Sequence, residues 1–313
     1  MQVLSSDSAD AVKWLHSFGL ALDVVSQCGG HSLPRTHRLT PGPDGKVAPV
    51  GFSIVSKLSA HLATLPDVEI IKNASVSKLL TESIGKTNTG ITGVEYSVGG
   101  GETQTLKADA VILCTGGFGA NVEMLEKHAP RCRLLPTTNG DSADGSGMKL
   151  AEAAGAALVD MDQVQVHPTS FVDPAAPDAR TKFLAPEALR GSGAILVNDK
   201  GKRFVDELGT RDKVTAAITS GDVLPRVNVH LVVNEAMVET FGRAAFDFYF
   251  KVKKFFVQVK GAAGLAAHLN ASAEDVAATL MAYGNGQDEF GKTVFPGKFT
   301  TDEDLCTLFG LVT

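Results

Sequence analysis

The feature that most limits the fold of this chain is a short apolar run that stops at a pair of glycines. In ADAVILCTGGFGANVEML, residues 108–125, the apolar residues 111–114 precede Thr115, Gly116 and Gly117, and a helical pattern follows. This order is typical of a buried strand in an open α/β sheet, where ligands bind at the carboxyl ends of the strands. We therefore predict a buried central strand at 111–114 and a nucleotide contact at the glycines, although a plain strand-to-helix turn would need the same residues.

A second glycine-rich segment lies a short distance downstream. TTNGDSADGSGMKLAEAAGAAL, residues 137–158, brings Asn139, Asp141, Asp144 and two glycines to the start of a helical pattern. The unpaired N–H groups at a helix start favour an anion such as phosphate. The 32 glycines of the chain, set against one tryptophan and three tyrosines, agree with a site where the backbone approaches a nucleotide closely.

Composition excludes several classes of protein. The chain has 313 residues, 20% of them charged, and a net charge of −6, which argues against a main role in binding nucleic acid. No apolar run reaches the length of a membrane span, and the first residues lack the pattern of a secretory signal. The four cysteines show neither a CxxC pair nor metal-ligand spacing, so we expect buried thiols in a reducing compartment and no metal site.

The remaining patterns predict a mixed helix-and-sheet chain with two parts. The first part, 1–161, is rich in strands and glycine turns, and the second, 162–313, has longer loops and a hairpin at 193–207 with DKGK at its tip. Helical patterns cover 8–22, 49–65, 122–129, 145–158 and 271–287. Strand patterns cover 68–82, 90–98 and 105–117, and a strand followed by a helix is expected over 227–242.

Several segments, in order and spacing, resemble the soluble fumarate reductase flavoproteins, which form a larger group with succinate dehydrogenases and aspartate oxidases. These segments are DAVILCTGGFGAN, TNGDSADGSGMKLAEAAGA, QVHPTSFVDP, EALRGSGAILVNDKGKRFVDE and TRDK, with GGHSLPRTHR near the start. The resemblance implies FAD as cofactor and reduction of fumarate to succinate. It also implies an incomplete Rossmann-like FAD-binding domain at 1–161 and an α+β clamp domain at 162–313.

The resemblance further implies roles for single residues. Arg211 of TRDK delivers the proton, Glu187 and Arg190 relay it, and His167 of the HPT element holds a substrate carboxylate, with Glu187 also at the substrate. From the residues alone, an i,i+3 helix pair is the preferred interpretation of Glu187 and Arg190. Arg211 could be a cap, and His167 a turn residue.

Cofactor contacts are implied in the first half of the chain. The residues concerned are Val76, Thr115, Gly116, Gly117, Asp144 and Ser146. Val76 would offer its backbone to the adenine, and a core valine is the alternative. The basic side chains of the loop 29–38, His31, Arg35, His37 and Arg38, either approach the cofactor or form a solvated surface.

The chain also departs from this family. No GxGxxG loop precedes the strands, and VGGGE, residues 98–102, is predicted to be a hairpin turn because no helix follows it. Pro186 stands where some relatives carry a threonine, Ser146 replaces an aspartate, and the family's closing segment is absent. We therefore expect an internal piece of such an enzyme, with weak flavin binding by itself.

The resemblance leaves other functions and the surroundings open. The alternatives are a related flavin oxidoreductase acting on another unsaturated or amino acid, and a non-catalytic truncated derivative. The implied partners are a dicarboxylate substrate and an electron donor such as NADH, supplied through another domain or protein. The implied location is intracellular, either cytoplasmic or in an organelle such as a mitochondrion or a peroxisome-like body.

Overall fold

The computed structural model describes residues 2–43, 47–84, 88–219 and 229–311. The chain divides into two compact units: unit 1 is Met1–Leu65 with Gln165–Thr313, and unit 2 is Pro66–Val164. This division differs from the expected domains 1–161 and 162–313 because the first 65 residues group with the second half. The assignment of 1–161 as an FAD-binding domain and 162–313 as a clamp domain remains a prediction.

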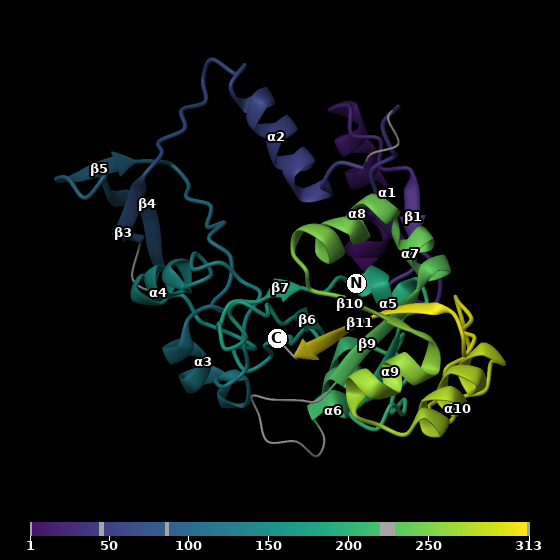
Figure 1. Cartoon of the computed structure of the whole chain (residues 1–313). Coiled ribbons are helices and arrows are strands. Elements are labelled where there is room, and N and C mark those ends of the chain that lie inside the picture. The colour runs from purple at the N-terminus through teal and green to yellow at the C-terminus, as the bar shows by residue number, and fades with distance from the viewer. Residues whose placement is uncertain (1, 44–46, 85–87, 220–228, 312–313) are drawn as a thin grey trace. The chain divides into compact units, whose positions relative to one another are not determined.

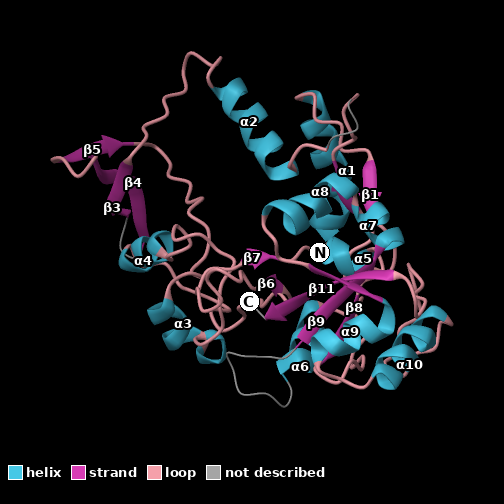
Figure 2. Ribbon diagram, in the orientation of Figure 1, coloured by secondary structure: helices cyan, strands magenta, loops and turns pink. Residues whose placement is uncertain are grey.

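Unit 1 is built on a six-stranded antiparallel sheet (Figure 2). The order along the sheet is β7 (Phe183–Leu184), β6 (Ser170–Phe171), β11 (Asp304–Leu311), β9 (Val229–Asn234) and β8 (Ile195–Asn198), with β10 (Val257–Lys260) also paired to β11. The register pairs Leu196 with Leu231 and Cys306 with Val233. β11 therefore occupies the middle of the sheet.

The centre of this sheet is the main apolar core. The side chains of Ile195, Leu196 and Val232 are 0% exposed, as is Leu305 of β11. Burying each such aliphatic side chain contributes about 1.5–3 kcal/mol. β-Branched and aliphatic residues suit a pleated, buried surface, which explains why the short segments β8 and β9 form strands.

Two helices of unit 1 begin at side-chain caps. Asn234 accepts a hydrogen bond from the Met237 N–H at the start of α7 (Glu235–Phe241), and Ser272 accepts one from Asp275 at the start of α10 (Ala273–Gly284). α10 packs against α9 (Gly261–Leu269). The other helical elements of the second half are α5 (Glu187–Gly191), α6 (Arg211–Thr219), α8 (Arg243–Asp247) and the π-helical η2 (Phe248–Val252).

The first residues of unit 1 form a small apolar cluster of their own. α1 (Gln2–Ser17) and α2 (Val50–Leu62) contribute side chains that pack against buried Leu20, Leu22 and Leu39. A two-stranded ribbon, β1 (Val24–Ser26) with β2 (Thr36–Arg38), lies between these helices in sequence. α2 confirms the helical pattern at 49–65, and α1 confirms the pattern at 8–22 in part, because the helix begins at Gln2 and ends at Ser17.

Unit 2 holds a three-stranded antiparallel meander and short helices (Figure 1). The strands are β3 (Ala74–Ile84), β4 (Asn88–Val98) and β5 (Thr103–Lys107), and the helices are α3 (Val122–His128), the 3₁₀ turn η1 (Pro130–Cys132) and α4 (Ser146–Ala153). The hairpin turn predicted at VGGGE is confirmed: Gly99 and Gly100 have φ of 59° and 76°, and Ser97 pairs with Thr103. Glycine occupies such left-handed positions without steric cost.

The strand predicted at residues 111–114 is wrong. This run has no regular structure, and Ile112, Leu113 and Cys114 are exposed, Ile112 to 86%. A strand persists only when a neighbour pairs its N–H and C=O groups, and none of the described strands pairs with this run. The same reason applies to residues 68–71, which were also expected to be extended and are not in a strand.

The mixed helix-and-sheet class is confirmed, with antiparallel pairing in every described sheet. The hairpin at 193–207 is confirmed in a short form. After β8 the chain turns at Gly201, whose φ is 71°, and Val197 forms a β-bridge with Arg203. β10 and β11 were not predicted. Among the described helices, none combines the length and apolar character needed to cross a bilayer.

Candidate active site

The predicted catalytic residues come from three neighbouring elements of unit 1. Glu187 is the first residue of α5, directly after Pro186, and Arg190 lies one turn later. Arg211 is the first residue of α6, and His167 precedes β6. An acidic side chain at a helix start is stabilised by the unpaired N–H groups there, which favours Glu187 in this position.

The structure gathers these side chains around the Glu187 carboxylate. Arg211 Nε donates to Glu187 Oε1 at 2.6 Å, and Arg211 Nη2 lies 3.3 Å from Oε2. Arg190 Nη2 is 3.5 Å and His167 Nε2 3.9 Å from Oε1. Arg211 Nη1 also donates to Gln165 Oε1. Two cations and an imidazole therefore converge on a single carboxylate.

The four side chains of this cluster differ in how far they are exposed to solvent. The side chain of Arg190 is 0% exposed, those of His167 and Glu187 are 11% and 12%, and that of Arg211 is 40%. Arg211 is thus the most accessible member of the cluster, and Arg190 is the innermost. Arg190 Nη1 donates to the Glu207 carbonyl at 2.7 Å, while its Nε and Nη2 are buried without a hydrogen-bond partner among the described residues.

The charges shift the titration of each group. Burial, with a contribution from the Arg190 charge, lowers the pKa of His167 to about 4, so the ring is neutral near pH 7. Burial acts to raise the pKa of Glu187, but the hydrogen bond from Arg211 and the charges of both arginines lower it overall. The Glu187 hydrogen bond raises the pKa of Arg211, whereas burial lowers that of Arg190.

Two contacts with Thr169 bear on the tautomer of His167. His167 Nδ1 lies 2.8 Å from the Thr169 carbonyl oxygen and 3.3 Å from the Thr169 amide nitrogen. When Nδ1 donates to the carbonyl, Nε2 is an acceptor, and when Nδ1 accepts from the amide, Nε2 carries the proton. Only the second tautomer can donate from Nε2 to an anion.

A glycine loop packs directly against the cluster, which sequence reasoning missed. A Cβ atom on Gly29 would lie 3.0 Å from Arg190 Nη1, and one on Gly191 would lie 2.1 Å from the Gln27 carbonyl oxygen. The Gly30 N–H donates to the Leu208 carbonyl at 2.7 Å. The signal was present in GGHS, but the interpretation concerned only the basic residues that follow.

Those basic residues differ in their contacts. Burial and the Arg35 charge lower the pKa of His31, and the charges of Glu187 and Arg211 also act on it. His37 Nδ1 lies 2.7 Å from the Leu22 carbonyl oxygen, and Arg38 Nη1 donates to the Phe241 carbonyl at 3.3 Å. His37 and Arg38 therefore hold the loop to its own unit.

The two glycine-rich segments predicted to contact a cofactor meet in unit 2. The Gly145 N–H donates to the Gly117 carbonyl at 3.1 Å, and a Cβ atom on Gly147 would lie 1.9 Å from Thr115 Oγ1. Gly116 has a φ of 75°, and nothing lies within 4 Å of a Cβ built on it or on Gly117. The paired glycines therefore border open space, which fits the close approach of a flat ligand.

Asp144 and Ser146 fix the start of α4, and Val76 lies elsewhere in the unit. Asp144 Oδ1 accepts a hydrogen bond from the Ser146 N–H at 2.8 Å, and this bond lowers the pKa of Asp144. Asn121 Nδ2 donates to the Asp144 carbonyl at 2.8 Å. Val76, in β3, is 40% exposed, so it is not a core valine in this structure.

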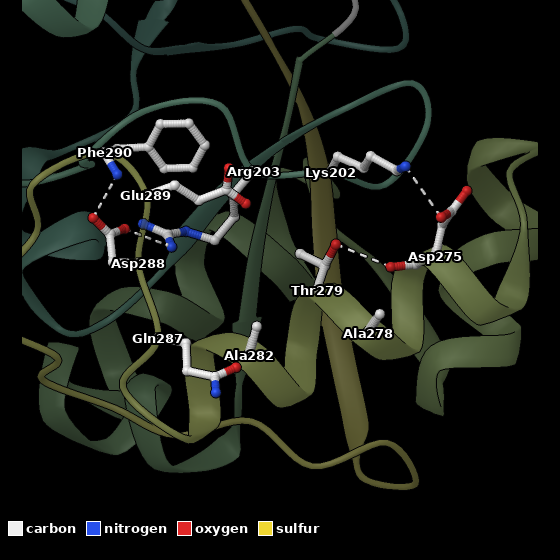
Figure 3. A pocket seen from close by; sticks show the side chains of 10 residues that line it. All are labelled: Lys202, Arg203, Asp275, Ala278, Thr279, Ala282, Gln287, Asp288, Glu289 and Phe290. Carbon is white, nitrogen blue, oxygen red and sulfur yellow. Dashed lines mark hydrogen bonds and ion pairs between the residues drawn. The ribbon is translucent and has the colours of Figure 1, made fainter.

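A separate surface cavity of about 520 Å³ lies over α10 (Figure 3). Its wall carries two ion pairs, Lys202 Nζ with Asp275 Oδ1 at 3.1 Å and Arg203 Nη1 with Asp288 Oδ1 at 2.9 Å. None of the predicted site residues lines this cavity.

The chain is similar in sequence to known flavoproteins. A sequence model of the FAD binding domain family matches residues 1–313. "Fumarate reductase 1" of Saccharomyces cerevisiae is 41% identical over 311 residues, which cover 96% of this chain and 64% of that protein. "Fumarate reductase" of Schizosaccharomyces pombe is 40% identical, covering 94% of this chain and 57% of that protein. The chain thus spans about three fifths of the length of these two relatives.

A solved structure is also similar. An open conformation of a flavocytochrome c3 fumarate reductase superposes with a TM-score of 0.67 at 26% identity, covering 99% of this chain and 52% of that chain.

Proposed function

Because the chain belongs to the FAD-binding domain family, we propose that it carries the substrate-reducing site of an FAD-dependent enzyme that converts fumarate to succinate. The family match and the yeast relatives confirm the resemblance to fumarate reductase flavoproteins and indicate FAD as the cofactor. The observation that carries the proposal is the convergence of Arg211, Arg190 and His167 on the Glu187 carboxylate.

The proposed reaction needs a hydride at one alkene carbon of fumarate and a proton at the other. Bound reduced flavin supplies the hydride. The protein must hold the carboxylates of the substrate, stabilise the negative charge that develops, and deliver the proton. Each of these tasks matches a side chain of the cluster.

Arg211 is the proposed proton donor. It is the most exposed member of the cluster, and its Nε–H is already directed at Glu187 Oε1 at 2.6 Å. Since the Glu187 hydrogen bond raises its pKa, Arg211 is cationic before the reaction and releases a proton only to a strongly basic centre such as a developing carbanion.

Glu187 and Arg190 then restore the proton. Glu187 Oε1 lies between Arg211 Nε and Arg190 Nη2, at 2.6 Å and 3.5 Å. Burial lowers the pKa of Arg190, which makes this inner guanidinium a better proton source than an exposed arginine. The proton lost by Arg211 is therefore replaced by one from Arg190, and Arg190 regains a proton from solvent before the next turnover.

His167 is proposed to bind one substrate carboxylate as a neutral donor. At a pKa of about 4 the ring carries no charge at neutral pH, and the Thr169 amide can donate to Nδ1. Nε2 then bears the proton and can donate to an anion. Because an approaching carboxylate favours the charged ring, binding of a dicarboxylate should raise the pKa of His167.

The residues proposed to hold FAD are in unit 2. They are Val76, Thr115, Gly116, Gly117, Asp144 and Ser146. The open space beside Gly116 and Gly117 and the ordered start of α4 support this assignment. The electron donor is proposed to be a reduced nicotinamide or another carrier, acting through a further domain or protein. An intracellular location, in the cytoplasm or an organelle, is also part of this proposal.

The test is a flavin titration followed by a reoxidation assay. The purified chain is mixed with FAD, binding is followed by visible absorbance, and the bound flavin is reduced anaerobically. We expect weak binding and reoxidation by fumarate, with little reoxidation by acrylate, which lacks the second carboxylate. L-Aspartate is saturated and cannot accept a hydride, so it is added instead to the oxidised flavin, where we expect little reduction. Faster reoxidation by acrylate would indicate a different unsaturated substrate, and bound flavin that no acid reoxidises would indicate a non-catalytic derivative.

A further inference from the structure

Behind Arg190 lies a second ionic cluster that the proposed reaction does not use. Its centre is Glu207, whose side chain is 0% exposed. Arg203 binds the carboxylate with two donors, Nε to Oε1 at 2.8 Å and Nη2 to Oε2 at 2.9 Å. Lys292 Nζ lies 3.1 Å from Oε2, and the Leu196 N–H of β8 donates to Oε1 at 3.2 Å. Every side of this carboxylate is therefore occupied.

Glu207 is connected to the proposed proton relay by its main chain. Its carbonyl oxygen accepts the hydrogen bond from Arg190 Nη1 at 2.7 Å. The carboxylate and the carbonyl belong to the same residue, so fixing the carboxylate also fixes the acceptor that orients Arg190. The Arg190 guanidinium is confined on another side by Gly29, where a Cβ atom would come within 3.0 Å of Nη1.

The signs of the charges alternate along this connection. Starting from the surface cavity of Figure 3, the order is Asp288, Arg203, Glu207, then Arg190, Glu187 and Arg211. Each ion pair in this series spans 3.5 Å or less, and Arg190 contacts Glu207 through the hydrogen bond to its carbonyl oxygen. Arg190 therefore has an ion pair with Glu187 on one side and the main chain of a second glutamate on the other.

From these contacts we infer that Glu207, held by Arg203 and Lys292, is a positioning residue that orients Arg190 and keeps it cationic for the proton relay. The inference rests on the proposed function, because it gives Glu207 a role through Arg190.

The electrostatic surroundings of Arg190 agree with this role. Burial lowers its pKa, the carboxylates of Glu187 and Glu207 raise it, Arg211 lowers it, and the Cys28 thiol raises it. Of the two carboxylates, Glu187 itself changes charge in the proposed relay. Glu207 takes no part in the proposed relay.

The first experiment uses the whole chain without flavin and measures how fast phenylglyoxal labels each arginine, followed by peptide mass spectrometry. The Arg190 side chain is 0% exposed, so the dicarbonyl reaches its neutral guanidine only when the surrounding contacts open. Loss of the Glu207 charge should both loosen the contact that orients Arg190 and lower its pKa, so Arg190 should become more reactive. In Glu207→Gln we expect labelling of Arg190 at pH 8 at least about tenfold faster, which is one pKa unit of change. Arg35 and Arg131, which lie outside this cluster, should label at unchanged rates.

The matched control is Asp206→Asn. Asp206 is the preceding residue and shares Lys292, at 3.3 Å, but it does not contact Arg190. Asparagine keeps the Oδ1 acceptor for the Leu208 N–H, so only the charge is removed. Labelling of Arg190 should stay within about twofold of the parent protein, well below one pKa unit.

A second variant covers the case in which Glu207→Gln exposes all arginines by unfolding. Glu207→Gln with Lys292→Met removes one charge of each sign, which keeps the buried cluster balanced. Selective labelling of Arg190 in either variant supports the inference. Parent-like labelling of Arg190 in a folded variant, or a rise equal to that of Asp206→Asn, overturns it.

The fumarate assay then separates this inference from the proposed function. With FAD bound, Glu207→Gln should lower kcat about tenfold or more with a small change in KM, because Arg190 loses its orientation toward Glu187. The pH profile of kcat should also move to lower pH, because Arg190 then loses its proton at lower pH. Selective labelling without any fumarate reduction by the parent would refute the proposed function while leaving the Glu207–Arg190 coupling intact. Normal fumarate reduction by the parent, with parent-like labelling of Arg190 in Glu207→Gln, would refute the Glu207–Arg190 coupling while leaving the proposed function intact.

Discussion

The two units prepare for their proposed tasks in different ways. In unit 1, the polar groups around Glu187 are already within 4 Å of one carboxylate oxygen, and the arginine behind them is fully buried. In unit 2, the glycines proposed to face the cofactor border open space, and the apolar run before them is exposed. The side chains of the proposed substrate site already contact one another without a ligand. The proposed flavin site has open space beside its glycines, which a bound cofactor would fill.

The largest effect is expected for Arg211→Lys in unit 1. Lysine keeps the charge but loses the planar fork that donates to Glu187, so the proton would be delivered from the wrong place. With FAD bound, we expect fumarate reduction to fall about 10²–10⁴-fold, with a smaller change in substrate affinity.

The control for this substitution is Arg243→Lys. Arg243 also pairs with a glutamate, Glu239, at 2.7 Å, but it lies on α8. Its replacement should leave turnover unchanged. Turnover of Arg211→Lys equal to that of this control would remove the acid role from Arg211.

A stability comparison sharpens the contrast between the units. In unit 1, Gly191→Ala places a Cβ atom 2.1 Å from the Gln27 carbonyl oxygen, and a backbone atom cannot move aside easily. We expect a loss of about 3 kcal/mol in the free energy of unfolding, measured in urea. In unit 2, Gly117→Ala meets nothing within 4 Å and should change it by less than about 0.5 kcal/mol.

The Gly117 variant has a second use. If Gly117 borders the cofactor, the added methyl group should weaken FAD binding while stability is unchanged. Equal destabilisation by the two alanines would contradict the contrast between a filled and an open glycine turn.

The third prediction concerns acid. His167 has a folded-state pKa of about 4, below its ordinary value of 6.5, so the unfolded chain binds more protons between these values. The stability due to neutral His167 is present above pH 6.5 and is lost as the pH falls toward 4. From pH 7 to pH 5 this single group should cost about 2 kcal/mol of unfolding free energy.

His167→Gln should remove this part of the acid sensitivity, as measured by urea unfolding at the two pH values. Some sensitivity will remain, because burial also lowers the pKa of His230 to about 4. An identical loss in the parent and the variant would mean that His167 titrates normally in the folded chain.

The smallest effect is expected in unit 2, for Ile112→Thr. Ile112 is 86% exposed, so the free energy of unfolding should change by less than about 0.5 kcal/mol. The comparison is Leu196→Ala in β8, a side chain that is 0% exposed, where about 2–5 kcal/mol is expected. A cost of more than 2 kcal/mol for Ile112→Thr would indicate that residues 111–114 are buried after all.

The sequence predicted most of the elements with local signals. Helical periodicity located α1, α2, α3, α4 and α10, and glycines located the turns of the β4–β5 and 193–207 hairpins. Such signals depend on a few neighbouring residues. The run at 111–114 has the same local signal as a buried strand, but strand formation depends on partners elsewhere in the chain, which a local pattern does not contain.

The same limit applies to the candidate site. Arg211, Glu187, Arg190 and His167 were selected through the resemblance, and the structure places them together. The role of Gly29 against Arg190 and the enclosure of Glu207 by Lys292 join residues far apart in sequence, so no spacing rule reveals them.

The position of β11 has a consequence for how the chain acquires its structure. This strand, the most C-terminal one described, pairs with β6, β9 and β10, and its register joins Gly310 to Phe171. Pairings between distant residues close long loops and form slowly. During synthesis, β6 and β9 leave the ribosome well before the strand that must lie between them. The exposed edges of these strands are then open to wrong partners until β11 is synthesised, so chaperone dependence and aggregation during expression should depend on β11.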